Sequence, residues 1–185
     1  MFDPSLTEAY LAILKEELLP ATGCTEPIAI AYCAAVLRKT LGSLPQRVEA
    51  VCSGNIIKNV KSVVVPNTGG LKGIPAAIAA GLAAGDADAG LQVISHVTPE
   101  QKQEIRRCLE QTPMEIRCGT SPCLLDIALY GFHGPNSAMV RITNHHTNIV
   151  HIEKNGQVSL DLPIVASAED HLQDKSVLDL RGIVA

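Results

Sequence analysis

The spacing of apolar residues changes near Met114, and this change constrains the fold more than any other feature of the sequence. Before it, apolar residues recur every three or four positions; after it, they alternate with polar ones. The first period is typical of helices and the second of half-buried strands. The predicted strands cover 114–117, 124–130, 138–143 and 147–153, with Asn155-Gly156 as a hairpin turn. We therefore expect an α+β fold, with a mixed, largely antiparallel sheet and helices packed on one face.

The first half of the chain predicts a pair of helices and then shorter elements. The capping-box spacing of Ser5 and Glu8 starts a helix over 6–19. Pro27 suits the first turn of a second helix that reaches about Leu41. The further elements are a strand over 47–53, a segment of helical spacing over 55–64 whose β-branched end leaves its type open, an alanine-rich helix from about 74, a short strand over 91–95 and a helix over 98–111.

This layout predicts three parts. Residues 1–45 form a helical segment, 46–165 an α+β domain, and 166–185 a polar connection to something outside this chain.

The composition argues against several classes of protein. Hydrophobic residues make up 46% of the chain and charged residues 18%, which is normal for a globular core. The formal charge is −4 and there is no basic run, so we expect no nucleic-acid partner. No apolar run reaches the roughly 18 residues of a membrane span, and the early acidic residues are unlike a signal peptide. We expect a cytoplasmic protein whose six cysteines are reduced.

Cys24 lies in the stretch T-G-C-T-E-P, directly before a helix-start signal. A helix N-terminus presents free N–H groups and about half a positive charge, so a thiolate is favoured there and its pKa falls. Gly23 lets the backbone approach a bound group, and Thr25 and Glu26 are polar partners or caps. The alternative is a small residue in a turn between two helices.

A glycine-rich loop, N-T-G-G-L-K-G, precedes the alanine-rich helix. Stacked N–H groups around Thr68, Gly69 and Gly70, together with Lys72 and the following helix, predict a site for a phosphate or carboxylate. The spacing is not that of a P-loop. A flexible lead-in to a tightly packed helix is the alternative.

Asn55, Lys58 and Asn59 share one face if their segment is a helix. Two amides and an ammonium on one face are suited to holding the carboxylate of an amino acid. The alternative is a solvated polar face.

Three histidines lie close together in the sequence, at 145, 146 and 151. On one extended strand His145 and His151 share a face, which suggests zinc, but no cysteine or carboxylate completes a recognisable zinc spacing. We therefore favour a substrate-facing or structural role over a bound metal.

The remaining cysteines do not complete a metal site in the sequence. Four residues, Gly-Thr-Ser-Pro, separate Cys118 from Cys123, and two cysteines cannot hold an iron–sulfur cluster. We interpret them as buried thiols of a turn. Cys33, Cys52 and Cys108 have apolar neighbours and are expected in the core.

Four motifs, in order, resemble the L-cysteine desulfidase / serine dehydratase α-chain-like family. They are P-A-T-G-C-T-E-P, S-G-N-I-I-K-N-V, V-P-N-T-G-G-L-K-G and N-H-H-T-N-I-V-H-I-E-K-N-G. The resemblance covers essentially the whole chain, but members of that family are about twice as long. The chain therefore looks like their N-terminal part, in which residues 1–45 belong to the catalytic helical domain.

The resemblance implies a β-eliminating lyase that converts cysteine or serine to pyruvate and ammonia without pyridoxal phosphate. A 4Fe-4S cluster held by three cysteines acts on the leaving group, and Cys24 matches the first of these ligands. The other two lie in the missing C-terminal half, so this chain alone is expected to be inactive and free of cluster. The resemblance implies substrate-binding roles for Thr25, Glu26, Asn55, Asn59, Thr68, Gly69, Gly70 and Lys72, and Lys58, His145 and His146 are the candidates for the base that takes the Cα proton.

Two other readings stay open. The same fold can serve as a non-enzymatic module that binds or senses an amino acid without a cluster. Thiol-redox catalysis by Cys24 is weaker, because no C-x-x-C is present. The small-residue helix over 74–84 also leaves a homo-oligomer possible.

Overall fold

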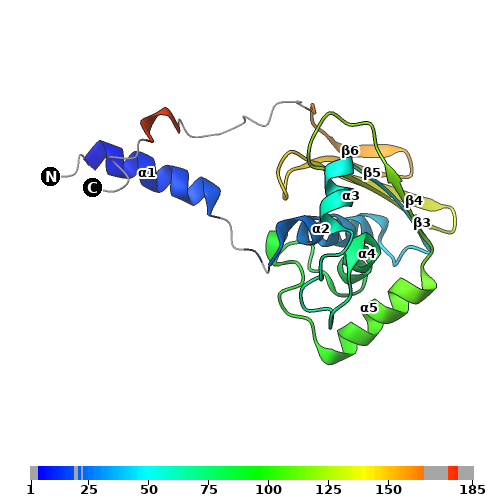
Figure 1. Cartoon of the computed structure of the whole chain (residues 1–185). Coiled ribbons are helices and arrows are strands. Elements are labelled where there is room, and N and C mark those ends of the chain that lie inside the picture. Colours follow the sequence, from blue (N-terminus) through cyan, green and yellow to red (C-terminus); the bar gives the residue numbers. More distant parts are fainter. Residues whose placement is uncertain (1–3, 19–20, 22, 165–174, 179–185) are drawn as a thin grey trace. The chain divides into compact units, whose positions relative to one another are not determined.

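The computed structural model describes residues 4–18, 21, 23–164 and 175–178 (Figure 1). Contacts within the chain divide it into two compact units. One unit contains the described residues near the two ends of the chain, and the other contains 21 and 23–164. The second helix, predicted as part of a separate helical segment, lies in the same unit as the sheet.

The smaller unit consists of helix α1 (Pro4–Glu17) and the 3-10 turn η2 (Lys175–Val177). The hydroxyl of Tyr10 donates to the carbonyl of Val177 at 3.3 Å. The helix already begins at Pro4, so Ser5 lies inside it and the predicted capping box is wrong. Proline suits this first turn because its missing N–H has no partner there in any case.

The larger unit contains one six-stranded sheet with the order β2-β1-β3-β4-β5-β6. Its strands are β1 (Arg47–Cys52), β2 (Met114–Cys118), β3 (Asp126–His133), β4 (Asn136–Thr143), β5 (Ile149–Lys154) and β6 (Gln157–Asp161). Strands β1 and β2 are parallel and all other neighbours are antiparallel. The predicted α+β class with a mixed, largely antiparallel sheet is confirmed.

The predicted hairpin turn is also present. Asn155 and Gly156 join β5 to β6 with positive φ angles of 51° and 78°. A two-residue hairpin turn with positive φ at both positions favours Asn-Gly, because the resulting twist matches that of the strands.

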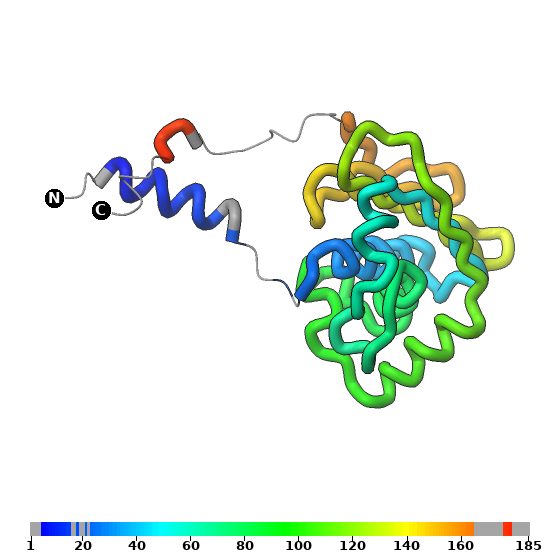
Figure 2. The backbone as a smooth tube through the Cα atoms, viewed as in Figure 1, coloured from blue at the N-terminus to red at the C-terminus, as the bar shows by residue number. Residues whose placement is uncertain are grey.

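Helices α2 (Thr25–Leu41) and α4 (Gly73–Ala84) form the core with the sheet, and Figures 1 and 2 show them on one side of it. Ile28, Ile30 and Leu37 of α2 are completely buried, and each such side chain contributes about 1.5–3 kcal/mol relative to exposure. The helices touch backbone to backbone, since a Cβ on Gly81 would lie 2.0 Å from the carbonyl oxygen of Ala31. Glycine and alanine are required at this crossing.

The remaining helices are α3 (Gly54–Val60) and α5 (Pro99–Gln111). Thr98 and Gln101 form a complete capping box at the start of α5. The predicted strand over 91–95 is wrong: a 3-10 turn, η1 (Gly90–Gln92), occupies part of it. Leu91, Val93 and Ile94 are apolar because the turn is buried against the core. No helix in the described ranges is both long and apolar enough to cross a membrane.

The side of the sheet away from α2 and α4, called the open face below, carries polar side chains. Along β3, Ile127 and Leu129 point into the core, and the alternate residues Asp126, Ala128 and Tyr130 belong to the other face. The register aligns one row across all six strands on this face: Arg117, Val51, Ala128, Arg141, His151 and Asp161.

Candidate functional site

Cys24 is the N-cap residue directly before α2, and its side chain is exposed. Its own backbone is not helical (φ −59°, ψ 124°), and its side chain does not cap the helix. Instead, the thiol donates to Oε2 of Glu26 at 3.1 Å. The sulfur is therefore accessible from solvent and held by a carboxylate two residues further on.

Glu26 joins three elements that are distant in the sequence. Its Oε1 accepts a hydrogen bond from the amide of Asn59 on α3 at 3.3 Å. His146, from the loop between β4 and β5, lies near enough for the two charges to interact. We call Cys24, Glu26, Asn59 and His146 the Cys24 cluster.

The sequence-based expectation that the pKa of Cys24 falls is wrong. Partial burial and the hydrogen bond to Glu26 raise the pKa of the thiol above its usual 9.0. The hydrogen bond from Cys24 lowers the pKa of Glu26, which stays ionised. Glu26, in the first turn of α2, therefore carries the negative charge that the helix terminus favours, and Cys24 keeps its proton.

His146 is half-buried, and this burial lowers its pKa below the usual 6.5. The charge of Glu26 acts in the opposite direction and the charge of His145 in the same direction. At pH 7 the imidazole is therefore neutral and able to accept a proton. His145 is exposed, and the two neighbouring histidines thus have different surroundings.

The start of α2 lies beside the start of the glycine-rich loop. Gly23 has φ +143°, and a Cβ built on it would lie 2.9 Å from Cγ of Pro66. This close approach explains why a glycine precedes Cys24. It also places two of the four sequence motifs next to each other.

The glycine-rich loop itself uses its polar groups to close on its own backbone. Thr68 is buried, and its hydroxyl donates to the carbonyl of Val65 at 2.7 Å and accepts from the amide of Leu71 at 3.1 Å. The side chain of Asn67 donates to the carbonyl of Ile94 at 2.8 Å. Thr68 is therefore a structural residue of the loop in this structure.

The other predicted binding residues are spread over two helices and the loop. Gly69 and Gly70 are exposed with positive φ, and Lys72 is exposed at the start of α4. Asn55 and Lys58 are exposed on α3, the helix that also carries Asn59. Thr25 is half-buried at the first position of α2.

The six cysteines are all free thiols. Cys33, Cys52 and Cys108 are buried as predicted, and burial raises the pKa of Cys52 to about 12. Cys123 is buried too, but Cys118 is exposed at the end of β2, so the prediction of two buried thiols is wrong for Cys118.

An iron–sulfur cluster at Cys24 would require further thiolate ligands close to this residue. Within the described ranges, no three His, Cys, Asp or Glu side chains gather as metal ligands. Cys24 offers one accessible thiol, and the described residues do not complete a three-thiolate site around it.

The third histidine of the predicted group lies on the sheet. Nδ1 of His151 on β5 forms a hydrogen bond with Oδ1 of Asp161 on β6 at 3.0 Å.

Comparison with known proteins identifies relatives, but their names state no activity. A UPF0597 protein of Desulfitobacterium hafniense is 48% identical over 177 residues, which are 96% of this chain and 41% of that protein. UPF0597 proteins of Treponema denticola and Fusobacterium nucleatum are 42% and 44% identical, over 98% and 95% of this chain and 42% of each of theirs. The chain is similar to UPF0597 proteins. It spans about two fifths of their length.

No protein-family model matches the chain, and no solved structure matches it.

These relatives correct the family resemblance drawn from the four motifs. They are named UPF0597 proteins and not cysteine desulfidases or serine dehydratases, so that family assignment is wrong. One of the four motifs, the glycine-rich loop, has a structural explanation. Asn67, Gly69, Gly70 and Gly73 have positive φ, and the residue types of this loop therefore follow from its backbone.

Sequence analysis also missed a polar pair on the open face. Asp126 is the acidic residue of β3 and Arg141 the basic residue of the middle of β4, and they form an ion pair. The available signal was a charge next to buried apolar residues in each of two predicted strands, because a buried charge requires a partner.

Proposed function

We propose that the Cys24 cluster forms one wall of the active site of an enzyme that removes the β-substituent of a small amino acid, such as cysteine or serine, giving pyruvate and ammonia. The observation that carries this proposal is that the exposed thiol of Cys24 and the amide of Asn59 both donate to the carboxylate of Glu26 at the start of α2. The charge of Glu26 also acts on His146.

Three members of the cluster act at the Cα proton in this proposal. His146 takes the Cα proton, because its lowered pKa leaves the ring neutral at pH 7. The charge of Glu26 stabilises the imidazolium that forms, and Asn59 orients Glu26. Lys58, exposed on the same helix as Asn59, meets the substrate carboxylate.

The reaction then balances with one water. The electron pair left at Cα forms the Cα–Cβ double bond as the C–S or C–O bond breaks, and the leaving group takes up the proton that His146 removed from Cα. The resulting aminoacrylate rearranges to an imine, which water hydrolyses to pyruvate and ammonia.

A 4Fe-4S cluster is proposed for the longer protein alone, with Cys24 as one ligand and no pyridoxal phosphate. The described residues do not complete its ligand set, so the roles above are written for the side chains alone. A cytoplasmic location, where the six thiols stay reduced, is part of the same proposal.

Activity is tested by comparing this chain with a longer relative. The 185-residue chain and the D. hafniense UPF0597 protein are purified without oxygen, incubated with iron and sulfide, and assayed for pyruvate with L-cysteine and L-serine. We expect pyruvate from the longer protein and none from the chain alone. Absence of pyruvate from the longer protein with both amino acids contradicts the proposal.

Binding is tested on the chain itself. L-Serine is added to ¹⁵N-labelled chain, and we expect saturable shifts at the amides of Glu26, Asn59 and His146 that are lost in Asn59→Leu. Saturable binding of L-serine without turnover in the longer protein would favour the non-enzymatic amino-acid module.

A further inference from the structure

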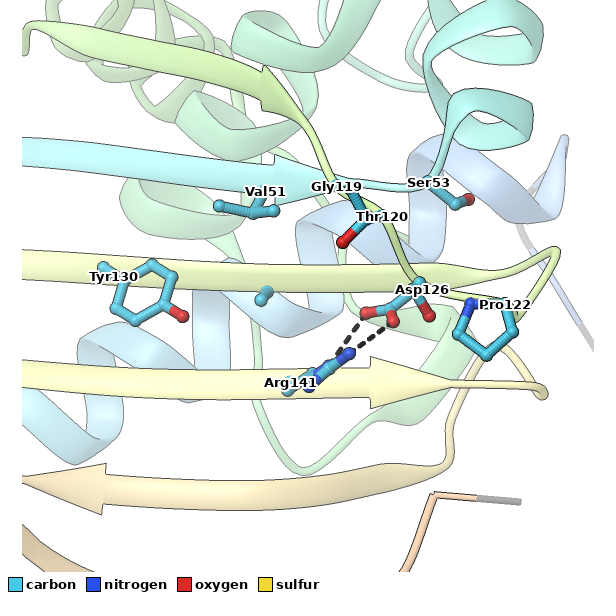
Figure 3. A pocket seen from close by; sticks show the side chains of 10 residues that line it. Val51, Ser53, Gly119, Thr120, Pro122, Asp126, Tyr130 and Arg141 are labelled. Carbon is cyan, nitrogen blue, oxygen red and sulfur yellow. Dashed lines mark hydrogen bonds and ion pairs between the residues drawn. The ribbon is translucent and has the colours of Figure 1, made fainter. Parts of the chain in front are cut away.

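The open face of the sheet holds a cavity that shares no residue with the Cys24 cluster. Its volume is about 380 Å³, at the small end of the range of roughly 300–1,000 Å³ for ligand pockets. Figure 3 looks onto it: β1, β3 and β4 form its floor, and the segment after β2 passes over one end.

Ala128 creates the hollow in this floor. The register places it between Val51 of β1 and Arg141 of β4, in the row that crosses the open face. Its small side chain leaves the space between two larger neighbours empty. Gly119 lets the segment after β2 lie close to the sheet, since a Cβ there would be 3.0 Å from Cγ1 of Val51.

Arg141 is held at the cavity by a two-point ion pair with Asp126. Nε donates to Oδ1 at 2.9 Å and Nη2 donates to Oδ2 at 2.6 Å, so the carboxylate occupies the side edge of the guanidinium. The Asp126 side chain is 5% exposed and that of Arg141 is 29% exposed. A nearly buried anion thus fixes the plane of a cation that still reaches solvent through the cavity.

The end edge of the same guanidinium, formed by Nη1 and the second hydrogen of Nη2, is the part that Asp126 does not use. The two other basic side chains of the row have acidic partners: Arg117 contacts Glu49 and Glu115, and His151 contacts Asp161 and Glu153. Within the described part of the chain, Asp126 is the acidic residue that forms an ion pair with Arg141.

The other walls combine hydroxyl groups with short apolar side chains. Tyr130 follows Ala128 on the same face of β3, and Thr120 and Ser121 line the cavity from the segment after β2. Figure 3 shows Tyr130 and Thr120 at the cavity. Val51, Ala128 and Pro122 supply apolar surface. Hydroxyl donors in a cavity that is also lined by a guanidinium suit an anion, and the apolar surface suits a short carbon chain.

We propose that this cavity binds a small organic carboxylate, held end-on by Nη1 and Nη2 of Arg141 with Tyr130 and Thr120 as further donors. Arginine is suited to this role because its planar donors match both oxygens of a carboxylate. The site does not depend on the Cys24 cluster, and its test is independent of any enzymatic activity.

The test compares propionate with propionamide, which have the same shape but differ in charge. Each is titrated into the ¹⁵N-labelled 185-residue chain at constant ionic strength, and the backbone amides of Gly119, Thr120, Ala128 and Arg141 are followed by NMR. We expect saturable shifts with propionate and none with propionamide. Inorganic phosphate is a third probe, and equal or tighter binding of phosphate overturns the assignment to carboxylates.

Two variants and one control locate the binding group. Arg141→Lys keeps the positive charge but loses the planar pair of N–H donors that matches a carboxylate. We expect the Kd for propionate to rise about tenfold or more. Tyr130→Phe removes one neutral donor, and we expect a rise of roughly threefold. Arg117→Lys, in the same row but outside the cavity, should leave the Kd unchanged.

Several results would overturn the proposal. These are no saturable shift with propionate, equal shifts with propionamide, or an unchanged Kd in both Arg141→Lys and Tyr130→Phe. Circular dichroism of each variant establishes that it is folded. If Arg141→Lys is unfolded, Tyr130→Phe alone decides.

Discussion

The Cys24 cluster and the Arg141 cavity both contain a carboxylate with hydrogen-bond donors, but they differ in burial. Glu26 accepts bonds from Cys24 and Asn59 at an exposed helix start. Asp126 is almost fully buried and accepts both bonds from one guanidinium. The cost of losing a partner should therefore be large at Asp126 and small at Glu26, since water can replace the partner only at the exposed site.

The largest expected effect comes from removing Arg141. Arg141→Ala leaves the Asp126 carboxylate buried without its cation, and we expect a loss of about 3 kcal/mol in the free energy of unfolding. Urea denaturation measures this loss. Cys24→Ala is the matched change in the other region and should alter stability by less than about 0.5 kcal/mol.

A double variant separates the charge from the packing. Asp126→Leu combined with Arg141→Met removes both charges and should recover most of the stability lost in Arg141→Ala. Equal losses in Arg141→Ala and Cys24→Ala would show that the two regions do not differ as described.

The second prediction concerns the contact that places the Cys24 cluster. Gly23→Ala puts a side chain at φ +143° and against Pro66, and we expect a loss of about 1–3 kcal/mol. Thermal unfolding followed by circular dichroism measures it. Gly70→Ala is the control: its φ is also positive, at +94°, but nothing lies within 4 Å of the added Cβ, so only the backbone cost applies. A smaller loss for Gly23→Ala than for Gly70→Ala would contradict the close contact with Pro66.

The smallest predicted effect is a shift in the titration of His146. Glu26→Gln removes the charge that raises the pKa of His146, so this pKa should fall further below 6.5. His145→Gln removes the charge that lowers it, so the pKa should rise. NMR titration of the His146 ring measures both, and shifts of the same sign would exclude the arrangement.

The same titration sets the direction of the pH dependence of stability. Because burial lowers the pKa of His146 in the folded chain, the unfolded chain binds more protons near pH 6.5. Stability should therefore decrease as the pH falls through that range. The lowered pKa of Glu26 adds a further decrease as the pH falls through and below 4.5.

Local rules account for what sequence analysis predicted correctly. The period of two identified the strands after Met114, because side chains alternate between the faces of a sheet. The turn at Asn155 and Gly156 follows from their positive φ angles. Pro27 lies in the first turn of α2 as expected. Each of these features depends on residues only a few positions apart.

The sites depend on contacts that no local rule contains. Asn59 reaches Glu26 across 33 positions, and Cys24 keeps its proton because that carboxylate is ionised. The sequence analysis grouped Cys24, the asparagine–lysine motif and the histidines by a resemblance that the relatives correct. The structure brings Glu26 and Asn59 together by packing α2 against α3, and places His146 where the charge of Glu26 acts on it.

The sequence by itself determined the α+β class, most of the helices and strands, and the buried positions of Cys33, Cys52 and Cys108. Only the tertiary structure decided that β1 and β2 are parallel, that Gly23 touches Pro66, and that Asp126 meets Arg141 on the open face. The physical reason is the separation along the chain of the residues involved. Backbone sterics and apolar periodicity act over a few residues, whereas pairing, close approach and the pKa of a side chain depend on which distant segments the packed core brings into contact.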